Sequence, residues 1–98
     1  MRDKICKAIM EKRRVRIYYQ GGHRVIEPHA FGYDSKGKWK LRAYQISGYS
    51  SRGETRGWKL FNVSDIKEFQ LLEEHFERPR PGYNPRGDKM IPTIVCKI

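Results

Sequence analysis

The sequence has too few cysteines for a zinc-bound or disulfide-rich fold. Cys6 and Cys96 lie near opposite ends of the 98 residues and form no CxxC pair, whereas a structural zinc site needs four closely spaced Cys or His ligands. It also lacks the ~18 consecutive apolar residues of a membrane helix, and its charged N-terminus has no signal-peptide core. We therefore expect a cytoplasmic protein without metal or cofactor, whose cysteines are small buried apolar side chains. A disulfide that clasps the two termini is the less expected alternative, because such a compartment is reducing.

Acidic residues are scarce as well. The chain has 11 Asp and Glu against 21 Lys and Arg, which gives a net charge of +10. An excess of this size raises encounter rates with polyanions, so nucleic acid is the expected partner. An anionic membrane surface is the second alternative, and we do not predict membrane binding. The hydrophobic fraction of 38% predicts a small core in one domain.

The apolar spacing changes from a helical to a strand period near residue 14. Residues 3–13 have the i, i+3, i+4 pattern of a short amphipathic helix. Alternating patterns then predict strands, with glycine-bearing turns between them, at 15–19, 23–28, 38–45 and 55–63. In the third of these, Trp39 and Leu41 share the face expected to be core, and Leu60 is expected there too.

The C-terminal third is more varied. Residues 64–76 predict a tight turn followed by a strand, and residues 77–90 an extended arm, because Pro79, Pro81 and Pro85 exclude a helix. Residues 91–98 form an apolar strand that needs an open sheet edge. That edge belongs either to the same chain or to a second copy, which would give a homodimer.

These patterns predict a mostly β (α+β) fold. A short N-terminal helix precedes a small barrel or strongly bent sheet in residues 1–76, and residues 77–98 add the arm and a last strand.

Five sequence pieces in this order resemble the WYL domain over roughly residues 3–72. They are Ala8-Ile9 in the helix, "VRIYY", "RVIEPH", "WKLRAY" and "RGWKLFNVSDI". The resemblance implies an Sm-like or SH3-like β-barrel of the kind that senses ligands in bacterial transcription regulators, usually behind a winged helix-turn-helix. Single-stranded DNA or RNA and nucleotides are the ligand classes it implies.

The resemblance also implies a pocket, whose matching residues here are His29, Tyr44 and Arg56. Two positions depart from the family pattern: Lys40 replaces the tyrosine of the name-giving tripeptide, and Asn62 stands where an arginine is usual. Basic residues on the neighbouring strands are expected to compensate, and aromatic side chains beside them to stack on bases. The predicted binding residues are therefore His29, Arg42, Tyr44, Arg56, Trp58 and Lys59.

No pattern predicts a catalytic residue. The "SGYSS" segment lacks nucleophile-elbow spacing, and no phosphate-binding glycine loop is present. The predicted function is non-enzymatic, regulatory ligand binding. Two alternatives remain: a small metal-free ribonuclease of the toxin type, and an interaction module for an acidic protein.

Overall fold

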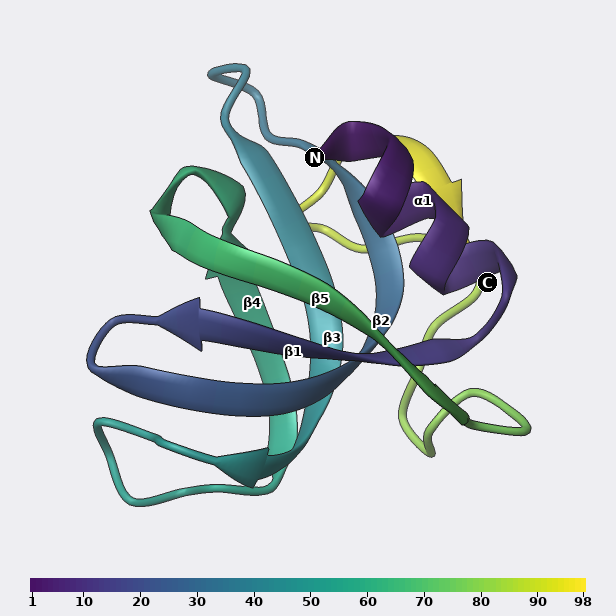
Figure 1. Cartoon of the computed structure of the whole chain (residues 1–98). Helices are drawn as coiled ribbons and strands as arrows, with labels where there is room; N and C mark the ends of the chain where they lie inside the picture. The colour runs from purple at the N-terminus through teal and green to yellow at the C-terminus, as the bar shows by residue number, and fades with distance from the viewer.

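The computed structural model describes all 98 residues and shows the predicted mostly β fold (Figure 1). One short helix precedes the sheet. It ends at Met10, three residues before the end predicted from the sequence. In chain order the elements are α1 (Arg2–Met10), β1 (Arg13–Tyr19), β2 (Gly22–Tyr33), β3 (Trp39–Gly48), β4 (Gly57–Asn62), the 3-10 turn η1 (Val63–Asp65), β5 (Ile66–His75) and β6 (Thr93–Lys97).

The strands form one antiparallel sheet in the order β4-β3-β2-β1-β5, with β6 paired to β2. No hydrogen-bonded ladder joins β4 to β5, so the sheet is open and the predicted closure into a barrel is not confirmed. The two strands are linked through η1, as the predicted tight turn requires. Near this turn the backbone N–H of Asn62 donates to the Tyr19 hydroxyl at 3.1 Å, which ties the end of β4 to β1.

The core lies between α1 and the concave side of the sheet. Ile5, Ala8 and Ile9 of the helix are fully buried there, as their helical spacing predicts. The alternation predicted for β1 and β3 is confirmed, because their buried positions follow a period of two. Leu41 is core as predicted, whereas Trp39 is half-buried and stacks on Phe31 with ring centroids 5.0 Å apart.

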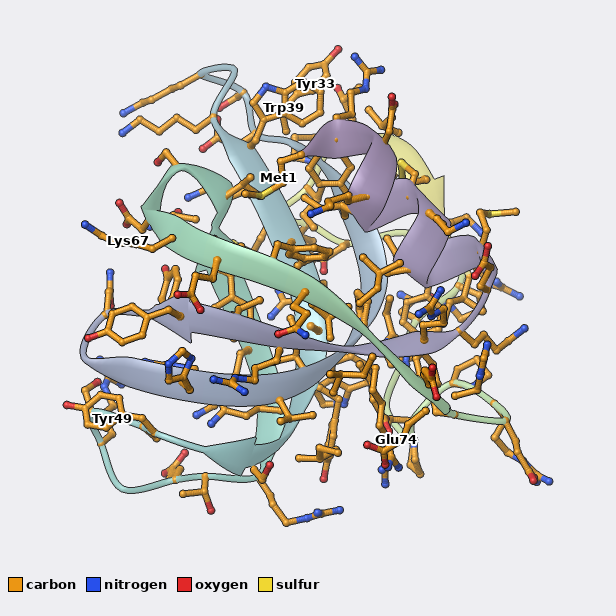
Figure 2. All side chains as sticks on the ribbon, in the orientation of Figure 1. Met1, Tyr33, Trp39, Tyr49, Lys67 and Glu74 are labelled. Carbon is orange, nitrogen blue, oxygen red and sulfur yellow. A yellow bond between two sulfur atoms is a disulfide. The ribbon has the colours of Figure 1, made fainter.

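Trp39 lies at the end of the sheet that faces the start of α1. Figure 2 shows it beside Tyr33, whose ring centroid is 5.0 Å away. The guanidinium of Arg2 lies 5.3 Å from the Trp39 centroid. The half-buried indole is thus contacted by Arg2, the first residue of the helix, at the edge of the core.

Strand β2 is long and changes partner at Pro28. It pairs with β1 up to Ile26 and with β6 from Ala30, while β3 follows it on the other edge with a register shift between Pro28 and Ala30. Proline has no N–H to donate, so it is placed where the β1 ladder has ended. The strand does not stop at Pro28; it continues to Tyr33.

The C-terminal strand pairs within the same chain. Its backbone passes so close to Gly32 that a Cβ there would overlap the carbonyl oxygen of Thr93. Of the two edges considered for residues 91–98, the structure uses the one on its own sheet. β6 also lies against α1 (Figure 1).

Cys6 of α1 and Cys96 of β6 form a disulfide across 90 residues of sequence. The expectation that the two cysteines are unpaired was wrong. It rested on the compartment assumed from other features, and the sequence separation gave no sign that β6 packs on the helix. The only helix has nine residues, and none is long and apolar enough to cross a membrane.

Candidate functional site

Arg42, Tyr44 and Trp58 lie together on the outer face of β3 and β4. Tyr44 is directly opposite Trp58 in the ladder and Arg42 is opposite Leu60, so their side chains point away from the core-facing positions between them. The Tyr44 and Trp58 rings meet edge to face, with centroids 5.5 Å apart. The prediction that Leu60 is core was wrong, because it shares this outer face and is only half-buried.

His29 lies beneath these aromatic rings and is fully buried. Its ring is 4.7 Å from the Trp58 centroid and stacks on Phe76 at 5.3 Å. Nε2 accepts the backbone N–H of Arg80 at 3.1 Å, so the proton is on Nδ1, which donates to the Glu27 carbonyl oxygen at 2.8 Å. Burial lowers the pKa of His29, although the Glu27 carbonyl and charge oppose this. The imidazole is therefore neutral at pH 7.

The Glu27 carboxylate is also fully buried, between two arginines. Arg80 donates to both of its oxygens, at 2.6 and 3.2 Å, and Arg14 donates at 3.0 Å. Burial alone would raise the Glu27 pKa, but the hydrogen bonds from Arg80 and Arg14 outweigh it and lower the pKa below its ordinary value. The same bonds raise the pKa of Arg80. The carboxylate thus stays charged, as burial permits only when partners compensate.

Residues 77–90, the C-terminal arm, run across this outer face. The Arg80 guanidinium lies 4.8 Å from the Tyr44 ring centroid, and the Trp58 indole N–H donates to the Pro81 carbonyl at 3.0 Å. Tyr83 stacks over Trp58 with centroids 6.2 Å apart. The predicted extended arm is therefore docked against aromatic rings of the sheet.

Arg42 forms an ion pair with a carboxylate of the arm. Its Nε and Nη2 donate to the two oxygens of Asp88, at 2.7 and 3.3 Å. The hydrogen bonds from Arg42 lower the pKa of Asp88, and burial opposes this. A two-pronged guanidinium is the geometry that recognises carboxylate and phosphate alike, so Arg42 is in a conformation competent to hold an anion.

A pocket of about 370 Å³ separates the outer face from the arm. Arg42 and Trp58 form its sheet side, and the arm supplies the rest of the lining, including Tyr83, Asn84, Asp88 and Lys89. This volume is in the range of small-molecule pockets. The lining combines aromatic rings with charges of both signs, because the Asp88 carboxylate lies on Arg42 and Lys89 adds a second cation.

Two of the predicted binding residues are elsewhere. Arg56 lies in the loop before β4, exposed, and its Nη1 donates to the Ile46 carbonyl at 3.0 Å. Lys59 points to the opposite face from Trp58, since it pairs with Ala43, and its Nζ donates to the Glu54 carbonyl at 2.8 Å. The structure brings together His29, Arg42, Tyr44 and Trp58, and whether these bind a ligand stays a prediction.

The two positions that depart from the family pattern contact each other. Lys40 and Asn62 are directly opposite in the β3–β4 ladder, and the Lys40 ammonium donates to the side-chain oxygen of Asn62. They lie on the outer face, at the end remote from Tyr44. The two residues therefore form one cross-strand hydrogen bond, and the charge of Lys40 is balanced by the Asp34 carboxylate 4.0 Å away.

A comparison with protein-family models matches the WYL domain over residues 2–71, well over half of the chain. The chain belongs to the WYL family. WYL domains are generally ligand-binding regulatory domains. The match ends within β5, so the arm and β6 lie outside the matched region of this WYL protein. Comparisons with curated proteins and with solved structures found no match.

Sequence reasoning missed Glu27, Arg80 and Asp88 as parts of the site. Glu27 precedes the Pro-His pair that carries the family resemblance, and an acidic residue at the centre of a strand is a usable signal of a buried ion pair. Asp88 lies in an arm otherwise rich in arginine and lysine. No local signal indicates which arginine it reaches, because Arg42 is 46 residues away.

Proposed function

We propose that this WYL domain binds single-stranded nucleic acid, or a nucleotide, in a regulatory role. The observation that carries the proposal is the shared outer face of β3 and β4, where Tyr44 lies opposite Trp58 and where Arg42 and Trp58 line a pocket of about 370 Å³. Aromatic faces accept any base by stacking, and a neighbouring guanidinium adds cation–π attraction and phosphate recognition.

The net charge supports the same ligand class. A charge of +10 on 98 residues favours polyanions over neutral ligands. Stacking on aromatic rings and contacts to phosphate do not depend on the identity of the base. We therefore propose binding with little sequence preference and with affinity that depends strongly on phosphate contacts.

The contacts of His29 favour binding over RNA cleavage. A metal-free ribonuclease needs a side chain that can take up or release a proton at the phosphate. Both ring nitrogens of His29 already have partners, and the ring is buried beneath Trp58. No contact in this site favours the ribonuclease or the acidic-protein alternative, and neither is proposed.

The test is fluorescence anisotropy with a short fluorescein-labelled oligothymidylate at increasing salt. Each neutralised phosphate should contribute about 0.7 to the slope of log K against log salt. Arg42→Gln should weaken binding by roughly tenfold or more, because it removes charge-assisted hydrogen bonds to the ligand.

Arg56→Gln is the matched control, since it removes the same charge from an exposed position. It should leave the affinity within about a factor of two at moderate salt, where distant exposed charges are screened. Equal losses in the two variants, or an affinity independent of salt, would contradict the proposed site.

A further inference from the structure

The arm engages each of the three residues that carry the proposed function. Asp88 places a carboxylate on the Arg42 guanidinium, Arg80 covers the Tyr44 ring and the Pro81 carbonyl accepts the Trp58 N–H. In this conformation no ligand phosphate can take up the same two donors of Arg42.

The contacts resemble those of a bound nucleotide in their chemistry. A carboxylate on two guanidinium nitrogens takes the place that a phosphate would occupy. The Tyr83 ring over Trp58, inclined by 26°, takes the place of a stacked base. The 14-residue arm therefore covers both parts of the proposed binding surface at once, with a carboxylate on Arg42 and an aromatic ring on Trp58.

Residues 82–90 are held mainly by partly exposed contacts: the Asp88 pair with Arg42, and the Tyr83 hydroxyl, which donates to the Ile98 carbonyl at 3.1 Å. Both flanks are anchored by buried side chains, Phe76 on one side and Ile91 on the other. Between them the Asp88 side chain is 17% exposed and paired with one arginine. Gly82 and Gly87 both have positive φ, +94° and +158°, and Gly82, in the left-handed region, is a turn that glycine makes without strain.

We propose that the arm is a built-in competitor: the Asp88 carboxylate occupies the phosphate position on Arg42, and ligand binds by displacing residues 82–90. This inference rests on the proposed function and adds its regulation. The pocket between Trp58 and the arm gives a ligand its first contact, after which a phosphate exchanges with the carboxylate on Arg42. Displacement leaves the buried anchors Phe76 and Ile91 in place.

The first experiment compares Asp88→Asn with Glu73→Gln, by anisotropy with the same labelled oligothymidylate. Both changes remove one negative charge, but Glu73 is exposed on β5. Asparagine keeps the oxygen that accepts the Met90 N–H and loses the ionic pair with Arg42. Asp88→Asn should bind up to about fivefold more tightly than the wild type, because the pair that competes with the ligand is partly exposed and therefore weak. Glu73→Gln should show only the small rise in affinity that comes from the higher net charge. Equal affinities in the two variants would overturn the proposed competition.

The second experiment measures hydrogen–deuterium exchange of the arm, without and with saturating oligothymidylate. In the free protein the N–H groups of Gly87 and Ile91 donate to Asn84 and Asp88 carbonyls. Their exchange should be faster in Asp88→Asn, and faster in the wild type once oligothymidylate is bound. Slower exchange on binding would overturn displacement, because it would mean that the arm closes over the ligand.

The two hypotheses fail in different ways. Binding by wild type and Asp88→Asn with equal affinity overturns the competitor and leaves the proposed function intact. No binding by either protein, with the arm released in the variant, overturns the proposed function and the competition with it.

Discussion

Two arginine–carboxylate pairs hold the arm to the sheet, and the positions of the arginine and the carboxylate are reversed between them. In one pair the sheet supplies the carboxylate, Glu27, and the arm supplies Arg80. In the other the sheet supplies Arg42 and the arm supplies Asp88. The bonds are nearly the same length, 2.6 and 3.2 Å in the first pair and 2.7 and 3.3 Å in the second.

The pairs differ in burial and in the number of partners. The Glu27 side chain is fully buried and shared with Arg14, whereas the Asp88 side chain is 17% exposed and has Arg42 alone. A Glu27 carboxylate that lost its arginines would be a charge that water cannot reach, whereas the partly exposed Asp88 carboxylate can exchange Arg42 for solvent ions. The bond lengths therefore do not distinguish the fixed contact from the exchangeable one; the burial does.

The largest expected effect is that of Glu27→Gln. It should lower the free energy of unfolding toward the lower end of the ~3–5 kcal/mol typical of a broken buried pair, because Arg14 and Arg80 are themselves partly exposed. Denaturant unfolding is the measurement. Glu74→Gln, which removes the exposed second partner of Arg14, should cost at most ~1 kcal/mol. Equal losses of unfolding free energy in the two variants would mean that Glu27 does not anchor the arm to the sheet.

A second, intermediate effect is expected from acid, through His29. Its Nε2 accepts the Arg80 N–H, and protonation would replace this acceptor by a donor. Because burial lowers the pKa of His29 below its ordinary 6.5, its contribution to stability is complete above pH 6.5. It is lost as the pH falls below that value, by at most about 1.4 kcal/mol per pH unit.

Two charged groups face the imidazole: Glu27 favours its protonation and Arg80 opposes it. Thermal unfolding of the wild type and of His29→Gln between pH 8 and about pH 5 should separate the loss of stability caused by His29 from that caused by other titrating groups. The variant should be less stable at pH 8 but lose less on acidification. Parallel curves for the two proteins would assign the acid effect to other groups.

The smallest expected effect on stability is that of Asp88→Asn. It should lower the free energy of unfolding by ~1 kcal/mol or less, because the pair with Arg42 is partly exposed. Denaturant unfolding beside Glu27→Gln makes the comparison direct. A loss as large as that of Glu27→Gln would make Asp88 a second structural anchor, and the contrast between the two pairs would disappear.

Local patterns predicted most of the fold. The period of two in β1 and β3 placed Val15, Ile17 and Leu41 on the buried face because alternation depends only on neighbouring residues. The same rule was ambiguous in β4, where Trp58 and Leu60 on one side and Phe61 on the other are all apolar. The buried face there is the one that carries Phe61.

The arm and its contacts could not be predicted in the same way. Arg80 reaches Glu27 across 53 residues and Cys96 reaches Cys6 across 90, and such pairs depend on how β6 and the arm return to the sheet. The family resemblance assigned His29, Tyr44 and Arg56 to one pocket; the structure brings the first two together around Trp58 and places Arg56 in the loop before β4. The resemblance could not place Asp88, which lies outside the matched region.

The disulfide between Cys6 and Cys96 has a consequence for the proposed competition between the arm and a ligand. It ties β6 to α1, and at the other end of the arm the Phe76 N–H donates to the Lys12 carbonyl at 2.9 Å. A displaced arm is therefore a short loop fixed at both ends, and short tethers of this kind hold a group at an effective concentration in the millimolar range. Under the proposed competition, a free nucleotide would have to exceed this internal concentration, weighted by the relative affinities of phosphate and carboxylate for Arg42. A polynucleotide, which presents many phosphates on one strand, would meet the requirement at a far lower molar concentration.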